Sequence, residues 1–159
     1  MTDQHESFVP PDGHVLTPYI CVRDATKALD WYADVFGATE TMGRFVDPDG
    51  RIGHAAFEIG GTHLMLSDAH PGSGAVAPER GNTTANYALH IYVPDVDATV
   101  RAAEEAGAVV QREPEDQFYG ARLGVFVDPF GVRWMVATHV RDVSQDDIEK
   151  RAADYSGAS

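Results

Sequence analysis

The stretch EPEDQFYGARLGVFVDPFGVRWMVATHV, residues 113–140, decides the fold of this chain. Residues 121–127 and 132–138 are mostly β-branched, aromatic or otherwise apolar, as is typical of strands. The Asp128–Gly131 turn between them, DPFG, contains the proline and the glycine that favour a chain reversal. We therefore predict a β-hairpin in this stretch.

The two faces of this hairpin carry different side chains, because successive residues of a strand point to opposite sides of the sheet. Arg133 and Met135 share one face, whereas Trp134 and Val136 share the other. Neither face has the purely polar composition of a sheet face that is exposed to solvent. We expect the face of Trp134 to pack against a helix and the face of Met135 to line a cavity.

The composition indicates a soluble globular protein. The chain has 159 residues, of which 43% are hydrophobic, and contains no apolar run near the length that spans a bilayer. Its net charge of -13 disfavours nucleic acid and anionic membranes as partners, because neither polyanion is steered toward an acidic surface. The single Cys21 excludes an intrachain disulfide, and the N-terminus lacks a basic region followed by an apolar one. We expect a cytoplasmic protein.

The first half of the chain predicts a strand, a helix and three more strands. Residues 15–23 alternate as a strand does, and Asp24 is suited to cap a helix that ends at Gly37. Strand-like runs follow at 39–46, 52–59 and 62–67.

The second half repeats this order. Residues 88–93 predict a strand, Asp95 is suited to cap a helix that stops at Gly107, and a strand that opens at 109–112 leads into the hairpin. Because the halves stay in step, we predict an internal duplication. The similar runs FVDPDG and FVDPFG close different hairpins within their halves, so we attribute their likeness to turn chemistry.

These patterns predict an α+β fold made of two βαβββ modules. The Gly-, Pro-, Ser- and Thr-rich run after the first module is typical of a linker, and Ser144 is suited to cap a short charged helix. The segments are a flexible N-terminal arm at 1–14, the first module at 15–67, the linker at 68–86, the second module at 87–140, and a C-terminal helix and tail at 141–159.

The paired modules, the strand ending VRD before ALDWYADVFGA, and EDQFYGARLGVFVDPFGVRWMVATHV together resemble the vicinal oxygen chelate superfamily. Within it the chain is similar to the PhnB-like branch, often labelled glyoxalase/bleomycin resistance protein/dioxygenase. The resemblance covers about residues 15–150. It implies that each module forms a curved, four-stranded mixed sheet, that the two sheets face one another around a cleft, and that the protein is a homodimer. It does not fix the chemistry, because one scaffold carries many sites.

Metal-using members of this superfamily place His or Glu on the first and last strands of each half. The resemblance puts Thr17, Met65, Ala88 and Met135 at those positions. A hydroxyl, two thioethers and a methyl group are poor ligands for a hard or borderline divalent ion. We therefore expect a protein without a metal or other cofactor.

The strand register also predicts which side chains line the cleft. These are mainly aromatic or sulfur-containing, with few polar groups, as in a pocket for a partly aromatic organic molecule. The set comprises Tyr19, Cys21, His63, Met65, His90, Tyr92, Arg133 and Met135. Phe118 and Tyr119 are expected in a loop at the mouth of the cleft. The alternative is that these residues only fill the space between the sheets.

Other roles stay open for several of these residues. His63 and His90 are candidate metal ligands, with Glu58 or Asp116 as an added carboxylate, although a structural role is commoner for a single histidine. Cys21 is a candidate nucleophile only if a base such as His90 is nearby. Arg122 and Arg133 either hold an acidic group of a ligand or form structural ion pairs with some of the 25 acidic residues.

Two functions follow from the sequence. The first is metal-free binding of a small, partly aromatic molecule, such as an antibiotic or a metabolite. The second is a metal-dependent lyase, isomerase or dioxygenase whose ligands have shifted to His63 and His90.

Overall fold

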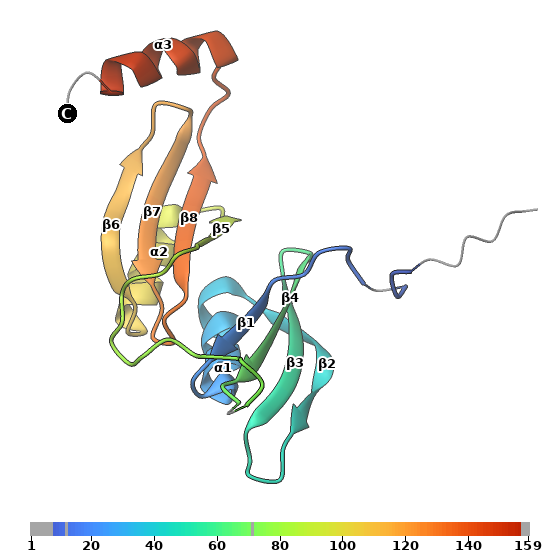
Figure 1. Ribbon diagram of the computed structural model, residues 1–159. Helices are drawn as coiled ribbons and strands as arrows, with labels where there is room; N and C mark the ends of the chain where they lie inside the picture. The colour runs from blue at the N-terminus through green and yellow to red at the C-terminus, as the bar shows by residue number, and fades with distance from the viewer. Residues whose placement is uncertain (1–7, 12, 71, 157–159) are drawn as a thin grey trace, which may run out of the picture. The chain divides into compact units, whose positions relative to one another are not determined.

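The computed structural model describes residues 8–11, 13–70 and 72–156, so most of the predicted arm at 1–14 lies outside the described residues. It divides into two compact units, residues 1–77 and 78–159. Figure 1 shows that each unit is a sheet with a helix along one side.

The first unit has the predicted order of elements. It contains β1 (Tyr19–Val22), α1 (Ala25–Phe36), β2 (Thr39–Val46), β3 (Ile52–Ile59) and β4 (Thr62–Asp68). The strands form a four-stranded sheet in the order β1-β4-β3-β2, in which β1 runs parallel to β4 and the other neighbours are antiparallel.

The second unit repeats this topology and adds a helix. It contains β5 (Leu89–Tyr92), α2 (Val96–Glu105), β6 (Val109–Asp116), β7 (Ala121–Val127), β8 (Arg133–His139) and α3 (Gln145–Ser156). Its sheet has the order β5-β8-β7-β6, again with a parallel first pair. The predictions of an α+β fold and of a duplicated βαβββ pattern are confirmed.

The DPFG turn joins β7 to β8, as predicted from the opening stretch. The Asp128 carboxylate accepts hydrogen bonds from the backbone N–H groups of Phe130 and Val132, and from Nε1 of Trp134, at 2.9 Å each. Asp128 is 4% exposed and Trp134 2% exposed, so one buried carboxylate fixes both the turn and the large aromatic residue that follows it. The similar FVDPDG run joins β2 to β3, which is a different hairpin of its unit.

Helices α1 and α2 are attached to their sheets at the same position of the repeat. Asp68, the Cα partner of Val22, accepts hydrogen bonds from the N–H groups of Ala25 at 2.9 Å and Ile52 at 2.8 Å. In the second unit the Thr138 hydroxyl oxygen accepts one from the N–H of Val96 at 2.9 Å. Each side chain satisfies a donor at the beginning of a helix that has no partner within that helix.

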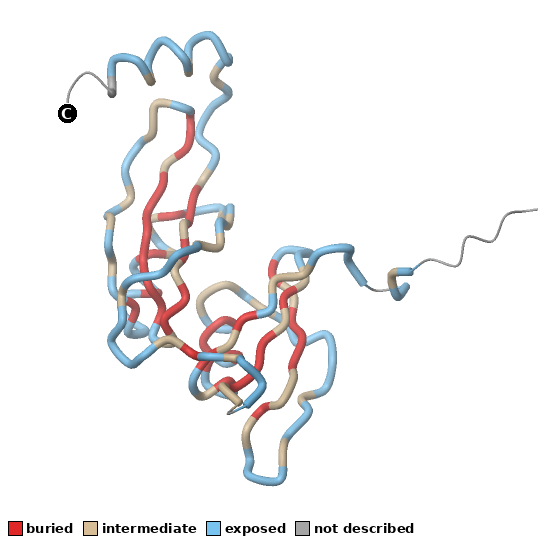
Figure 2. The backbone as a smooth tube through the Cα atoms, in the orientation of Figure 1, coloured by how far each residue is buried: buried red, intermediate tan, exposed pale blue. Residues whose placement is uncertain are grey.

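Buried residues concentrate in the helices' inner sides and in the two central strands of each sheet (Figure 2). The edge strands β2 and β6 are largely exposed. In the first unit the rings of Tyr32 and Phe57 stack with centroids 5.5 Å apart, which identifies the side of the sheet that α1 covers. Among the described residues, no helix is both long and apolar enough to cross a membrane.

The predicted start of the first strand was wrong. The strand expected at 15–23 begins only at Tyr19, and Val15 and Leu16 are more than 80% exposed. Pro18, just before it, has no N–H to donate to a ladder. The strand expected to open at 109–112 continues through Pro114 to Asp116, which an edge strand allows because one side of it needs no hydrogen-bonded neighbour.

Candidate functional site

Within the described residues of its own unit, each sheet has one face that no helix covers, which we call its open face. In the first unit Ile20, Val22, Leu64 and Leu66 are buried on the helix side. The alternate residues of the same strands point the other way and are less buried: Tyr19, Cys21, His63 and Met65. The alternation predicted for β1 and β4 is therefore present in the structure.

A row of side chains crosses the open face of the first sheet. Tyr19 is the Cα partner of Met65, Met65 of Ala56, and Ala56 of Met42, so the row runs through all four strands. Tyr19 is 52% exposed and Met42 48% exposed. Large apolar groups thus stand uncovered at both ends of the row.

His54 joins the aromatic residues of this face into a cluster. The Tyr19 hydroxyl is 3.0 Å from His54 Nδ1, and the two ring centroids are 5.5 Å apart. Phe45, 62% exposed, has its ring 6.2 Å from that of His54. The sequence placed His54 only near a hairpin, and the bulged edge strand β2 hides that Phe45 reaches the same face as His54.

His63 lies on this face beside two other titratable residues. Its Nε2 is 3.3 Å from Oε2 of Glu58, its cross-strand neighbour, and its ring is 4.5 Å from that of His14. Glu58 was one of the carboxylates that the sequence offered as a partner for His63. In the structure this pairing is a partly exposed contact within one sheet.

The open face of the second sheet has an equivalent row. His90 is the Cα partner of Met135, Met135 of Val125, and Val125 of Arg112. Met135 occupies the position that Met65 has in the first unit. It packs against a buried apolar cluster of Ala121, Leu123, Val125 and Ala137, so the centre of this face is filled.

Aromatic residues surround this filled centre. The rings of His90 and Tyr92 are 4.9 Å apart, and Tyr92 is 65% exposed. Phe118 and Tyr119 form an edge-to-face pair in the β6–β7 loop, with Tyr119 38% exposed. Burial raises the pKa of the Tyr119 hydroxyl, while nearby Arg112 lowers it and Tyr92 raises it.

Arg122 and Arg133 lie on opposite faces. Arg122 points to the helix side, where it binds both carboxylate oxygens of Asp97 at 2.7 and 2.9 Å and Asp116 at 3.2 Å. Arg122 therefore forms structural ion pairs, which is one of the two roles that the sequence left open for it. Arg133 is on the open face, and its Nε donates to Gln111 Oε1 at 2.9 Å.

The residues at the superfamily's metal positions do not fit a divalent ion. Thr17, Met65, Ala88 and Met135 offer one hydroxyl and two thioethers, which do not suit hard or borderline divalent ions. Within the described ranges, no group of three or more His, Cys, Asp or Glu side chains has the arrangement of a metal site. Asp116, the other carboxylate considered, is bound to Arg122.

Cys21 is not set up as a strong nucleophile. Burial and the nearby Asp68 carboxylate raise the pKa of the thiol, and Arg23 lowers it to a smaller extent. A raised pKa reduces the thiolate fraction at neutral pH, and the thiolate is the reactive form.

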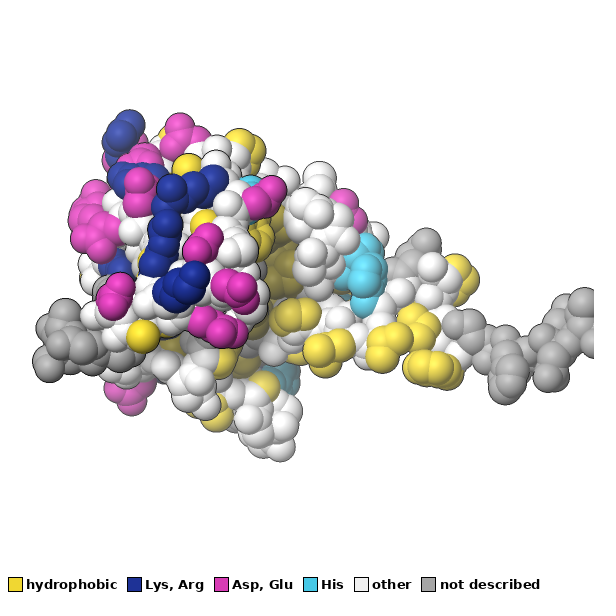
Figure 3. All heavy atoms as spheres, turned by 90° about the horizontal axis from the view of Figure 1, so that it is seen from above, with side chains coloured by type: hydrophobic (Ala, Val, Ile, Leu, Met, Phe, Trp, Pro, Cys, Tyr) yellow, Lys and Arg dark blue, Asp and Glu magenta, His cyan; other side chains and the backbone are white. Residues whose placement is uncertain are grey.

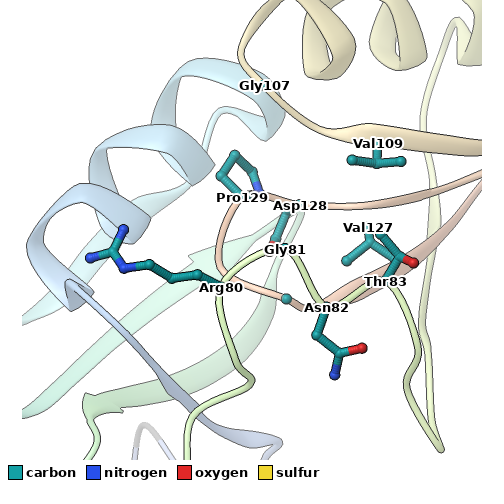
Figure 4. Close-up of a pocket in the computed structure, with 10 residues that line it drawn as sticks. Arg80, Gly81, Asn82, Thr83, Gly107, Val109, Val127, Asp128 and Pro129 are labelled. Carbon is teal, nitrogen blue, oxygen red and sulfur yellow. The ribbon is translucent and has the colours of Figure 1, made fainter.

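Two pockets lie within single units, and none of the predicted site residues lines them. The pocket of the second unit, about 280 Å³, lies between the Arg80–Thr83 segment and the Asp128–Pro129 turn, with Val109 and Val127 beside it (Figure 4). Its buried carboxylate, Asp128, is already occupied by three donors. The pocket of the first unit, about 430 Å³, is lined by Arg23, Arg51 and the Gly72–Ala77 segment. Asp49 binds Arg51 there.

The side of the second unit that carries α3 shows mixed charges. Lys and Arg side chains lie there among Asp and Glu side chains, rather than forming a continuous basic patch (Figure 3). This distribution does not favour a polyanion such as nucleic acid on this side.

The comparisons with known proteins agree with the topology. The model of the Glyoxalase/Bleomycin resistance protein/Dioxygenase superfamily matches residues 13–136. An uncharacterized protein of Mycobacterium tuberculosis strain H37Rv is 41% identical over 138 residues, which cover 84% of this chain and 79% of the relative.

Solved structures show the same fold. The crystal structure of TioX from Micromonospora sp. ML1 has a TM-score of 0.61 and 26% identity, over 80% of this chain and 100% of TioX. The PhnB protein of Bacillus cereus, described as a putative 3-demethylubiquinone-9 3-methyltransferase, also has a TM-score of 0.61. At 16% identity, over 79% of this chain and 99% of that protein, the likeness shows the fold alone.

Proposed function

Because the chain belongs to the Glyoxalase/Bleomycin resistance protein/Dioxygenase superfamily, we propose that it binds a small, partly aromatic organic molecule, such as an antibiotic or a metabolite, without a metal. The binding surface is formed by the open faces of its sheets. The carrying observation is the exposure of large aromatic side chains on these faces, 52% for Tyr19 and 65% for Tyr92. Covering these exposed rings with a second aromatic surface removes apolar area from water and therefore lowers the free energy of the complex.

The ligand-contacting residues in this proposal fall into two sets, one on each sheet. The first set is Tyr19, Cys21, His63 and Met65, joined by His54. The second set is His90, Tyr92, Arg133 and Met135 with the loop residues Phe118 and Tyr119. Arg122 is left out because Asp97 and Asp116 hold it on the helix side.

Two further parts of the proposal concern the whole protein. We propose that it acts as a homodimer, since the open sheets leave unpaired edge strands that a second copy would cover. We also propose a cytoplasmic location, because a single cysteine cannot form the intrachain disulfides that are common in exported proteins.

A planar fluorescent probe tests ligand binding directly. N-phenyl-1-naphthylamine, a neutral aromatic compound, should bind the protein, and Tyr92→Ala should weaken its binding by roughly 1 to 3 kcal/mol, the range for one lost aromatic contact. Tyr92→Phe keeps the ring and should bind almost as the parent protein does. Equal affinity of the Ala and Phe variants would remove Tyr92 from the binding surface.

Chelation separates the metal-free proposal from the metal-dependent lyase, isomerase or dioxygenase. EDTA should change neither the melting temperature nor the affinity for the probe. A melting temperature that falls with EDTA and recovers with a divalent ion would favour the enzyme instead, because a ligand that binds only the native state stabilises it by mass action. His63 and His90 would then be the first residues to replace.

A further inference from the structure

Arg112 is a cation on the open face of the second sheet that the sequence patterns did not single out. It stands in one row with Val125, Met135 and His90. The β6 register shifts between Val110 and Arg112, where the strand carries an extra residue. An extra residue reverses the simple alternation of faces, which is why counting along the sequence does not place this guanidinium.

The partners of Arg112 hold it weakly. Its Nη2 is 3.5 Å from Glu115 Oε2 and 3.3 Å from Gln117 Oε1. Arg122, by contrast, grips both oxygens of Asp97 at 2.7 and 2.9 Å. Strong charge-assisted hydrogen bonds measure about 2.7–2.9 Å, and an exposed ion pair contributes about 0–1 kcal/mol. An incoming anion can therefore replace Glu115 at small cost.

The surroundings of Arg112 fit the head of an amphipathic molecule. The Arg112 side chain reaches the β6–β7 loop, where its Nη2 is 3.3 Å from Gln117 Oε1, and the same loop carries the aromatic pair Phe118 and Tyr119. Val125 of the apolar cluster and Met135, which packs against that cluster, lie in the same row as Arg112 and form an apolar surface beside it. A planar ring thus finds aromatic and thioether contacts next to a two-pronged cation, the group that best matches the geometry of an oxyanion.

We propose that Arg112 binds an acidic substituent of the ligand, a carboxylate, sulfonate or phosphate, while the rings of the ligand lie against Tyr92 and Met135. This assignment rests on the proposed function, and it narrows the ligand class to aromatic acids. Such a local cation is needed because the chain as a whole, at a net charge of -13, repels anions.

The test uses two probes that share their rings and differ by one anionic group. 1-Anilinonaphthalene-8-sulfonate is N-phenyl-1-naphthylamine with an added sulfonate. The parent protein should bind the sulfonate at least tenfold more tightly than the neutral probe. Arg112→Gln should remove most of that difference, and Arg112→Lys should keep part of it. Arg101→Gln, which removes a cation from the exposed side of α2, is the matched control and should change neither affinity.

The outcomes distinguish this inference from the proposed function. Equal binding of the two probes by the parent protein, or an Arg112→Gln variant that keeps the full preference, would overturn the role of Arg112 while leaving aromatic binding in place. If neither probe bound, both proposals would fail. Since the probe pair is compared on the parent protein first, an Arg112→Gln variant that did not fold would still leave the preference for the acid measured.

Discussion

Trp134 shows how one side chain can fix the register of a whole hairpin. It is 2% exposed, and its Nε1 donates to the buried carboxylate of Asp128. Trp134→Ala should therefore cost about 3 to 5 kcal/mol of unfolding free energy, the range for deleting a large buried aromatic residue. Denaturant unfolding measures this, with Tyr92→Ala as a control on the exposed face, expected to cost less than ~1 kcal/mol. A similar small loss for Trp134→Ala would place the indole outside the packed layer.

The strand pattern alone places some of the candidate site residues but not others. Tyr19, Met65, His90 and Met135 could be placed because their strands alternate regularly, and the structure finds them on the open faces. Arg112 and Phe45 could not, because they belong to the bulged edge strands β6 and β2. Arg122 shows a different limit. Its choice between a ligand and an ion pair depends on Asp97, a residue 25 positions away.

At the scale of elements, Asp68 and Thr138 perform the same task with different chemistry. Asp68→Ala leaves two backbone donors, of Ala25 and Ile52, without their acceptor. Thr138→Val leaves one backbone donor, of Val96, and one carbonyl, of Val93, without their partner, and a carbonyl that loses one hydrogen bond is better tolerated than an unpaired N–H. Each unsatisfied buried donor costs about 1–3 kcal/mol, so Asp68→Ala should destabilise the protein more than Thr138→Val. Thermal and denaturant unfolding of the two variants compare them. A larger loss for Thr138→Val would mean that Asp68 does not link helix and sheet.

The order of elements was predictable, but their ends were less so. Caps and turns mark helices, and α1 begins after Asp24 and ends before Gly37 as the sequence indicated. Strand ends depend on hydrogen bonds to neighbours that the sequence does not show. Thus β1 is shorter than its apolar pattern, and β6 runs through Pro114 because no strand of its sheet lies on its outer side.

For the whole molecule, the sheet edges are the main argument for a second copy. Strand β6 is protected by Pro114 and by the acidic residues around it, as edge strands often are. Strand β2 ends in Phe45 and Val46, 62% and 60% exposed, next to an unpaired edge. An exposed apolar edge of this kind favours pairing with another chain.

We therefore expect light scattering at micromolar concentration to give twice the 17.2 kDa mass of the chain. Val46→Lys should shift the protein toward the monomer, because a charge on the edge of β2 opposes its burial against a second copy. Ala33→Lys adds the same charge to an exposed position of α1 and should leave the mass unchanged. A parent protein of 17.2 kDa at these concentrations would exclude the dimer. A dimer insensitive to Val46→Lys would place the interface away from β2, on the other edges or the 68–86 segment.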